Sequence, residues 1–274
     1  NTHISSLFMA INGVLEKNGY SLVCHIIEDG QTIDTDIIRD IAADNIGALI
    51  WSKSMEMNDM EKPDFLKNAM RNLSIPVITM EKYGFDCPGV DILFDYEKGG
   101  YMATRHLIEC GHRRIGCVAG KQSFHVTMQR LNGYKKALEE SGISYDPDLV
   151  YFGDYTMESG YEAFSYILGQ KVTAIFSMND EMAFGIYRAA RLYGVSIPED
   201  ISIIGFDNVP FADVMQVPLT TIGVPVIEMG KKLGEKVVEL IDNKEKLKER
   251  EEILYTPRLL VRGSTKSIPP VTVI

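Results

Sequence analysis

The chain has 274 residues, of which 45% are hydrophobic and 24% are charged, and its formal net charge is −10. This composition is that of a globular protein with one large or two ordinary domains. It argues against direct binding of nucleic acid, because phosphate contacts depend on lysine and arginine. No apolar run approaches the roughly 20 residues that a membrane span needs, and the first residues lack the features of a secretory signal. We therefore expect no membrane partner.

The cysteines are few and scattered, at Cys24, Cys87, Cys110 and Cys117. Three of them, Cys24, Cys110 and Cys117, lie in or next to apolar patterns and are predicted to be small, reduced core residues of a cytoplasmic protein. The five histidines do not cluster with them, so no metal site is expected.

Helical and strand patterns alternate along the first part of the chain, with short connections. Helices are expected at residues 5–18, 35–45, 63–73 and 96–110, and strands at 20–27, 47–51, 75–80 and 91–94. In the first helix Leu7, Phe8, Ile11 and Leu15 share one face. Such alternation is typical of a parallel, doubly wound sheet.

The alternation then starts again. Strands are expected at residues 114–119, 149–153, 173–177, 201–206, 219–224 and 251–262, and helices at 128–141, 158–168, 181–193 and 227–242. The charged stretch 243–252 is expected to be a solvated helix end or turn. The fold class is therefore α/β, with two Rossmann-like subdomains, parallel sheets and a ligand cleft between them.

Motifs for catalysis or for phosphate binding are absent from the sequence. No GxGxxG follows a strand, and GxxxxGK, GxSxG and HExxH do not occur. The pattern predicts neither catalytic residues nor a cofactor, and a Rossmann-type enzyme is disfavoured. Asp207 follows the strand 201–206, at the sheet edge where ligands bind in open α/β folds. A carboxylate there could accept hydrogen bonds from sugar hydroxyls, or it could merely cap the next turn.

Several stretches resemble, in order, the core of LacI/GalR-type transcription regulators. They are GHRRI at residues 111–115, RLNGYKKAL at 130–138, GDYTMESGY at 153–161, NDEMAFG at 179–185, PEDISIIGFDN at 198–208, LTTI at 219–222 and RGST at 262–265. Each motif alone is weak, but this many in the right order is specific. The resemblance covers residues 5–265 and implies a periplasmic-binding-protein-like fold.

The resemblance also implies a division of the chain. We expect an N-terminal subdomain at residues 1–112 that lacks its first strand, a C-terminal subdomain at 113–221, a crossover at 222–247, a closing strand segment at 248–265 and a tail at 266–274. The family's N-terminal helix-turn-helix would precede residue 1. The implied partners are a small-molecule effector, most simply a sugar, a second copy of the chain, and operator DNA bound through the absent head. The main alternative is a periplasmic-type sugar-binding protein of a transporter.

The resemblance assigns the central effector contacts to Arg130, Asn179 and Asp207. Arg130 can fork onto a ring oxygen, two hydroxyls or a carboxylate. Asn179 offers a donor and an acceptor, although it could instead cap the helix that follows, a role that Asp180 could also take. Asp207 is the matched acceptor.

Further contacts are assigned with more open alternatives. Tyr155 matches an aromatic that packs on the sugar, or it is ordinary packing. Ser52 matches a polar contact, Glu181 a ligand-facing position or a first-turn helix charge, and Phe124 a loop residue that could close over the ligand. Lys98 stands where the lactose repressor has an aspartate, which with Arg130 would also suit an acidic sugar. In the tail, Val271–Ile274 is either without fixed structure or adds to a sheet edge.

Overall fold

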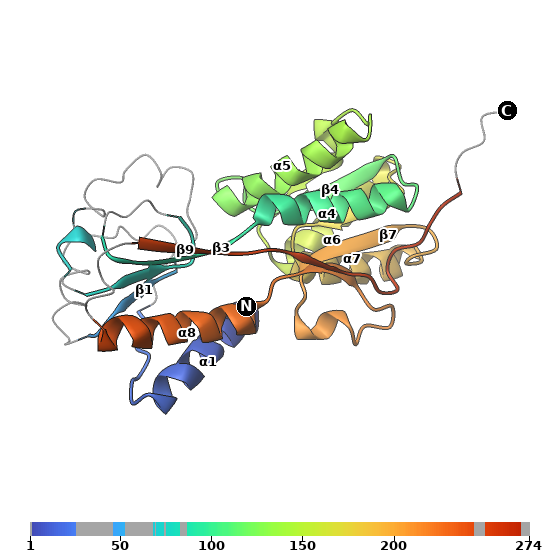
Figure 1. Ribbon diagram of the computed structural model, residues 1–274. Helices are drawn as coiled ribbons and strands as arrows, with labels where there is room; N and C mark the ends of the chain where they lie inside the picture. The colour runs from blue at the N-terminus through green and yellow to red at the C-terminus, as the bar shows by residue number, and fades with distance from the viewer. Residues whose placement is uncertain are drawn as a thin grey trace. The chain divides into compact units, whose positions relative to one another are not determined.

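Two separate sheets organise the chain in the computed structural model (Figure 1). The structure describes residues 2–25, 46–52, 68, 70–73, 75–82, 87–243 and 250–269. Unit 1 comprises residues 1–94 and 225–255, and unit 2 comprises residues 95–224 and 256–274. The prediction of two α/β units is confirmed, and neither unit is one continuous stretch of sequence.

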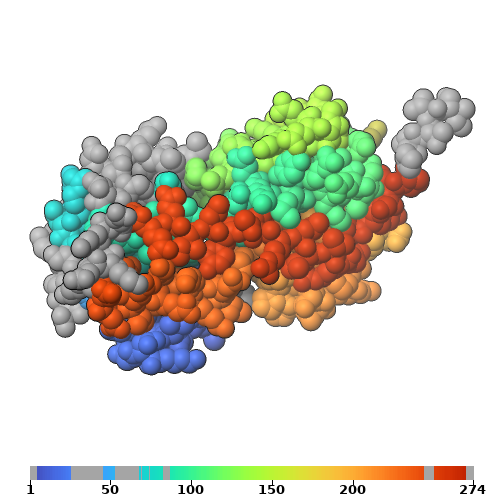
Figure 2. All heavy atoms as spheres, viewed as in Figure 1, coloured from blue at the N-terminus to red at the C-terminus, as the bar shows by residue number. Residues whose placement is uncertain are grey.

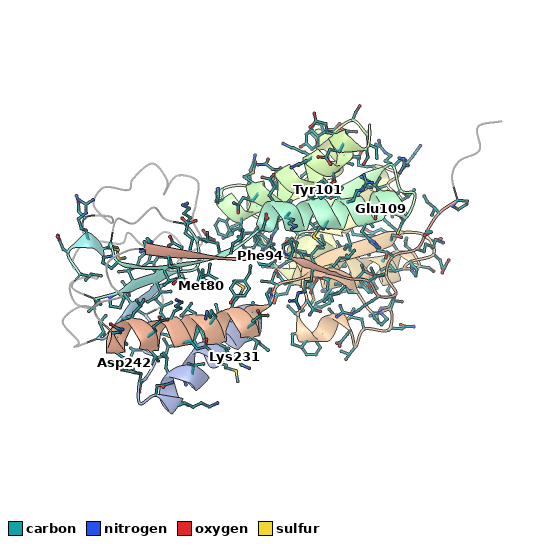
Figure 3. All side chains as sticks on the ribbon, in the orientation of Figure 1. Met80, Phe94, Tyr101, Glu109, Lys231 and Asp242 are labelled. Atoms are coloured by element: carbon teal, nitrogen blue, oxygen red, sulfur yellow. The ribbon has the colours of Figure 1, made fainter. Side chains whose placement is uncertain are left out.

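Unit 1 contains a parallel sheet in the order β1-β2-β3-β9, formed by Leu49–Trp51, Val77–Thr79, Gly89–Phe94 and Arg250–Tyr255. Helix α1 (Thr2–Lys17) packs against α8 (Val226–Asp242). Its buried face holds Leu7, Ile11 and Leu15, as the spacing predicted, whereas Phe8, predicted for the same face, is only half-buried. Asp242, labelled at the end of α8 in Figure 3, accepts a hydrogen bond of 2.8 Å from the Tyr20 hydroxyl.

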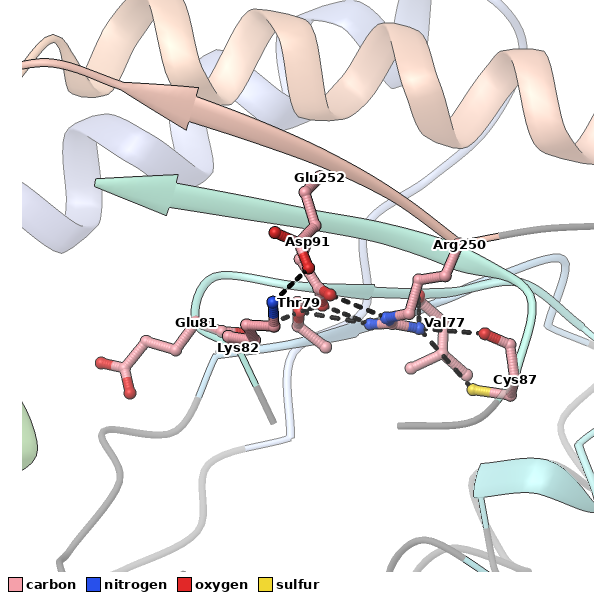
Figure 4. Close-up of polar contacts among 8 residues, drawn as sticks. All are labelled: Val77, Thr79, Glu81, Lys82, Cys87, Asp91, Arg250 and Glu252. Carbon is pink, nitrogen blue, oxygen red and sulfur yellow. Dashed lines mark hydrogen bonds and ion pairs between the residues drawn. The ribbon is translucent and has the colours of Figure 1, made fainter. Parts of the chain in front are cut away.

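One ion pair ties β9 to its neighbours in unit 1 (Figure 4). The Arg250 guanidinium donates to both carboxylate oxygens of Asp91, at 2.9 Å from Nε and 2.5 Å from Nη2. Its Nη1 donates to the carbonyls of Val77 and Cys87, at 3.3 and 3.2 Å, and Nη2 also reaches the Thr79 hydroxyl. Thr79 donates in turn to Asp91. This buried pair is saturated with hydrogen bonds, so it holds three strands together.

Several expectations for unit 1 were wrong or lie outside the described residues. Residues 20–25 form no strand: the chain turns at Gly19, and Ser21 and residues 23–25 are exposed. Cys24 is therefore no core residue. Residues 250–252 of the supposed charged turn belong to β9, where pairing with β3 satisfies their backbone. The helix expected at 35–45 and the tail segment 271–274 lie outside the described part, as does most of the helix expected at 63–73.

Unit 2 contains a sheet in the order β10-β8-β7-β6-β4-β5. These strands are Arg258–Leu260, Thr220–Gly223, Ser202–Asp207, Ala174–Ser177, Ile115–Ala119 and Val150–Phe152. All pairings are parallel except that of β10 with β8. Since β9 and β10 belong to different sheets, the single closing strand expected at 251–262 is two strands. Buried apolar residues fill the central strands, and Cys117 is among them.

Helices of unit 2 pack in two close pairs. Helix α4 (Tyr96–Glu109) lies on α5 (His125–Glu140), and α6 (Met157–Gly169) lies on α7 (Asp180–Tyr193). A Cβ at Gly133 would lie 2.0 Å from the Glu97 carbonyl oxygen, so only glycine allows α5 to approach α4 this closely. Tyr101 on α4 adds a hydrogen bond of 2.7 Å to Glu140 on α5 (Figure 3). The predicted boundary at residue 112 therefore differs from the division after Phe94, because α4 packs within unit 2.

The short 3-10 helices η2 (Pro147–Leu149) and η3 (Pro210–Ala212) complete unit 2, together with a C-terminal strap at residues 261–269. Figure 2 shows the red C-terminal segment running over the surface beside the green atoms of α4. Buried His112 fastens this strap, since its Nε2 lies 3.2 Å from the Lys266 carbonyl oxygen and 3.0 Å from the Ser202 hydroxyl. His112 Nδ1 lies 2.9 Å from the Thr173 hydroxyl, so both ring nitrogens have partners. His112 of the GHRRI motif thus joins the sheet to the strap directly after the RGST motif.

Candidate functional site

Three parallel strands of unit 2 end at one edge of its sheet. Strand β4 ends at Ala119, β6 at Ser177 and β7 at Asp207. We call this the carboxyl edge of unit 2, and it is the part of an open α/β sheet where ligands bind.

Arg130 of α5 reaches the carboxyl edge with a side chain that is only 7% exposed. Its Nη1 donates to the carbonyl oxygen of Met178. Its guanidinium carbon lies 4.0 Å from the ring centre of Phe206, 4.9 Å from that of Tyr96 and 5.7 Å from that of Tyr155. Since aromatic rings surround the guanidinium, a ligand would meet its hydrogen-bonding edge rather than its faces.

That edge is not saturated. The buried Arg130 Nε has no hydrogen-bond partner among the described residues. Its Nη2 lies 3.7 Å from Asp207 Oδ1, too long for a direct hydrogen bond. A buried donor without a partner is costly, and in a native protein it often marks the place of a ligand or water. The gap between Arg130 and Asp207 is therefore suited to a ligand oxygen.

Asp207 owes its direction to an unusual backbone. Its φ is 110°, that of Asn208 is 59°, and Tyr155 across the edge has a φ of 72°. Such left-handed conformations are strained for residues other than glycine and gather at functional sites. In a regular strand Phe206 and Asp207 would point to opposite faces, but the turn in β7 lets both approach the Arg130 guanidinium.

Tyr155 forms a wall of the site. Its hydroxyl lies 2.6 Å from the Thr127 hydroxyl, and its ring stacks on Phe124 with centroids 6.3 Å apart. Burial raises the pKa of Tyr155, so its hydroxyl is neutral and available for hydrogen bonding. The wall supports Arg130 on one side and meets the start of α5 on the other.

Asn179 caps helix α7, which was the structural alternative for this residue. Its Oδ1 accepts from the Met182 backbone N–H at 2.9 Å, and its Nδ2 donates to the Tyr155 carbonyl oxygen at 2.9 Å. The side chain is 3% exposed. Asn179 therefore couples the cap of α7 to the Tyr155 wall.

Asp180 is the fully buried first residue of α7. Its Oδ1 accepts from the Thr221 hydroxyl at 2.7 Å, and its Oδ2 accepts from the Val209 backbone N–H at 2.9 Å. Burial, and secondarily the charge of Asp207, raises its pKa to about 7. The carboxylate thus binds the turn that follows β7.

None of the contacts described above involves the side chains of Lys98, Glu181 or Ser52. Lys98 and Glu181 occupy the first turns of α4 and α7, with an exposed and a half-buried side chain. Ser52 belongs to unit 1, where it is exposed directly after β1. The cationic neighbour of Asp207 within unit 2 is Arg130 at 3.7 Å.

Sequence reasoning missed three side chains that shape the site. Phe206 was assigned only to the strand core, Tyr96 only to a helix start, and Thr127 to no role. Thr127 could have been found, because it lies three residues before Arg130 on the same helical face. The packing of Phe206 and Tyr96 around a cation left no pattern in the sequence.

Two negative findings apply to the described part of the chain. None of its helices is long and apolar enough to cross a membrane. No group of three or more histidine, cysteine, aspartate or glutamate side chains within it could hold a metal ion.

The fold and the carboxyl edge define an effector-binding domain of the periplasmic-binding-protein-like class. The model of the periplasmic binding protein-like domain matches residues 104–265. The HTH-type transcriptional repressor PurR of Photobacterium profundum is 34% identical over 264 residues, which cover 94% of this chain and 77% of the repressor. The regulator DegA of Bacillus subtilis is 36% identical over 248 residues, covering 90% and 72%. The chain belongs to the LacI/GalR family of transcription regulators, and it is their effector-binding core.

Solved structures agree with this assignment. A LacI family regulator from Enterococcus faecium with bound ribose superposes with a TM-score of 0.83 at 26% identity, covering 98% of this chain and 96% of the other. The regulator CelR in complex with cellobiose gives a TM-score of 0.81 at 27% identity, covering 96% and 79%. The transporter alternative is not supported, since these relatives are transcription regulators.

Proposed function

We propose that the chain senses a neutral polyhydroxyl molecule, a sugar or a close relative, that hydrogen-bonds between Arg130 and Asp207. The observation that carries this proposal is the unsatisfied edge of Arg130, with Nε unpartnered and Nη2 3.7 Å from Asp207 Oδ1. A hydroxyl group can accept a hydrogen bond from the guanidinium and donate one to the carboxylate. One sugar oxygen would thus bind both side chains and give Arg130 the acceptor that it lacks.

The charges of the carboxyl edge favour a neutral effector over an acidic one. Asp180 and Asp207 are carboxyl groups that approach each other closely enough for Asp207 to raise the pKa of Asp180. An anionic ligand would meet Asp207 beside Arg130, and the exposed Lys98 side chain lies in the first turn of α4. The acidic-sugar alternative is therefore the weaker one.

Structural relatives support the same ligand class. The Enterococcus faecium regulator holds ribose and CelR holds cellobiose, both neutral sugars. Phe124 and Tyr155 would flank the sugar, and Asn179 would hold that wall in place. Glu181 and Lys98 are proposed as rim contacts, and the contact assigned to Ser52 remains a prediction.

Effector binding is proposed to control operator DNA through linkage. If the effector prefers one conformation of the core, it shifts the protein toward that conformation, and operator affinity changes reciprocally. We expect a cytoplasmic homodimer without catalytic activity whose operator contacts come from an N-terminal helix-turn-helix. Met9 on α1, 76% exposed, is one apolar side chain that a second copy could cover.

A thermal-shift screen tests the ligand class. Ribose, cellobiose and other neutral sugars would be compared with sugar acids, sugar phosphates and nucleobases. A sugar at about one hundred times its Kd should raise the melting temperature by about 5 °C or more. Arg130→Met and Asp207→Asn should abolish that shift.

Arg188→Met is the matched control. Arg188 is also an arginine of unit 2 beside an aromatic ring, 4.9 Å from the Tyr161 ring centre, but it is exposed and lies on α7 away from the carboxyl edge. It should leave the sugar response intact. A response to acidic compounds alone, or a sugar response that survives in Arg130→Met, would refute the proposal.

A further inference from the structure

Asp180 holds the backbone on which Asp207 depends. Its carboxylate accepts from the Thr221 hydroxyl at 2.7 Å and from the Val209 N–H at 2.9 Å, and the Asn208 N–H is a further donor. Both oxygens are therefore occupied from β8 and from the turn after β7. The two residues that enter this turn, Asp207 and Asn208, have left-handed backbones. Strain of this kind persists only where surrounding contacts fix it.

The strand beneath Asp180 is shaped to admit its carboxylate. A Cβ at Gly205 would lie 2.2 Å from Asp180 Oδ1, so any other residue at this position would displace the carboxylate. This glycine of the PEDISIIGFDN motif lies within β7 and leaves room for the carboxylate. The GFDN motif at residues 205–208 and the ND motif at 179–180 thus pack together through the Asp180 carboxylate.

We propose that Asp180 is a positioning residue for the effector site, which fixes the direction of the Asp207 carboxylate by holding the Asn208–Val209 turn. This inference rests on the proposed function for the role of Asp207, but the contact itself does not. A charged carboxylate binds backbone N–H groups more strongly than a protonated one. Protonation of Asp180 would therefore loosen the turn and lower the affinity for the effector.

The surroundings of Asp180 place this protonation near neutral pH. Burial and the Asp207 charge raise the pKa of Asp180 to about 7, while its bonds to Thr221, Val209 and Asn208 oppose that rise. The ionisable and charged groups that face it are Asp207 from β7, with Arg130 of α5 behind it, and Tyr187 from its own helix.

Nuclear magnetic resonance of the ligand-free chain tests the contact directly. In a 15N-labelled sample, the amide signals of Asn208 and Val209 should move together between pH 5 and 9 with one midpoint. Asp180→Asn should abolish this movement. Thr221→Val should raise the midpoint, because it removes a hydrogen bond that favours the charged carboxylate, and Asp207→Asn should lower it by removing a like charge.

Asp146→Asn is the control, since Asp146 likewise accepts a backbone N–H, from Asp148 at 3.0 Å, but lies at η2. It should leave both amide signals unchanged. If these signals do not titrate, or still titrate in Asp180→Asn, the inference is overturned. If Asp180→Asn does not fold, the midpoints of the other two variants test the inference instead. The inference holds if Thr221→Val raises the midpoint and Asp207→Asn lowers it, and it is overturned if either midpoint stays unchanged.

A second measurement uses D-ribose as the probe. Its affinity for the wild-type chain should decrease as pH is lowered through the midpoint of the amide titration. Asp180→Asn should bind D-ribose about tenfold more weakly than wild type, the scale of one charge-assisted hydrogen bond. Tight binding to Asp180→Asn at every pH would contradict the positioning role. Failure of the wild-type chain to bind D-ribose would count against the proposed sugar class. The amide titration would still test whether Asp180 holds the Asn208–Val209 turn.

Discussion

The two units each contain a buried aspartate–arginine pair, and the pairs differ in saturation. In unit 1 Arg250 donates to both oxygens of Asp91 and to two backbone carbonyls. In unit 2 Arg130 stands 3.7 Å from Asp207, and its Nε has no partner within the described structure. The same two residue types thus form a structural lock in unit 1 and the candidate ligand site in unit 2.

Saturation is what separates the two roles. A buried ion pair offsets its desolvation only when further hydrogen bonds satisfy its remaining donors and acceptors. Arg250 meets this condition inside unit 1, whereas Arg130 would meet it only with an added oxygen. An unsatisfied buried donor, rather than the presence of charge, is what makes Arg130 the candidate ligand contact.

Removing the Asp91–Arg250 ion pair of unit 1 should produce the largest loss of stability. Arg250→Met leaves the Asp91 carboxylate, whose side chain is 3% exposed, buried without its counter-ion. The free energy of unfolding should fall by about 3–5 kcal/mol. Trp51, the sole tryptophan, is buried in unit 1, so its fluorescence in a urea titration reports this loss.

The double variant Asp91→Leu/Arg250→Met is the companion measurement. Replacing both members of a buried pair by apolar residues often restores stability. The double variant should recover most of the loss. A single variant that loses less than about 1 kcal/mol would show that the lock is not structural.

In unit 2 the buried side chain of His112 also has partners for all its polar atoms, and its removal should cost less stability than that of Arg250. His112→Ala removes the partner of Thr173, Ser202 and the Lys266 carbonyl, and should cost about 1–3 kcal/mol at pH 7. Burial lowers the pKa of His112 in the folded protein. Its stabilisation is therefore complete above the unfolded value of 6.5 and is lost as pH falls below it.

The stability gap between wild type and His112→Ala should thus be smaller at pH 5.5 than at pH 7. Urea titrations followed by circular dichroism at both values measure it. Asp180 contributes in the opposite direction, because its raised pKa makes the fold less stable as pH rises toward 7. This contribution is the same in wild type and in His112→Ala, so it cancels when the two are compared at the same pH.

The sequence predicted the fold well where apolar periodicity was strong. Apart from β10, the described strands and α-helices of unit 2 match the expected ones to within a few residues, because buried β-branched runs and amphipathic faces leave a clear pattern. The supposed strand at 20–27 failed, since apolar residues such as Val23, 69% exposed, occur there without burial. Periodicity cannot tell an apolar residue that faces solvent from one that packs.

The sequence indicated which residues gather at the carboxyl edge, but not their contacts. The resemblance assigned effector contacts to Arg130, Asn179 and Asp207; the structure brings all three to this edge, and their contact with an effector stays a prediction. It could not show that Asn179 is occupied by cap contacts or that Asp180 holds the turn. Those facts depend on hydrogen bonds between segments far apart in the sequence.

The smallest stability effect is expected where the comparison is most direct, at Arg130. The same substitution as in the lock, Arg130→Met, should lower the free energy of unfolding by only about 1–2 kcal/mol at pH 6. The hydrogen bond from Nη1 to the Met178 carbonyl is lost, but no direct hydrogen bond to Asp207 is lost, the buried donor without a partner disappears, and methionine can fill the space beside Phe206. At pH 6, below the raised pKa of Asp180, the remaining carboxyl pair is not doubly charged. Circular dichroism measures the stability of this variant. The urea titration followed by Trp51 fluorescence, which reports on unit 1, should be unchanged, whereas the thermal-shift response to sugar should be lost. A loss as large as that of Arg250→Met would instead make Arg130 a second structural lock.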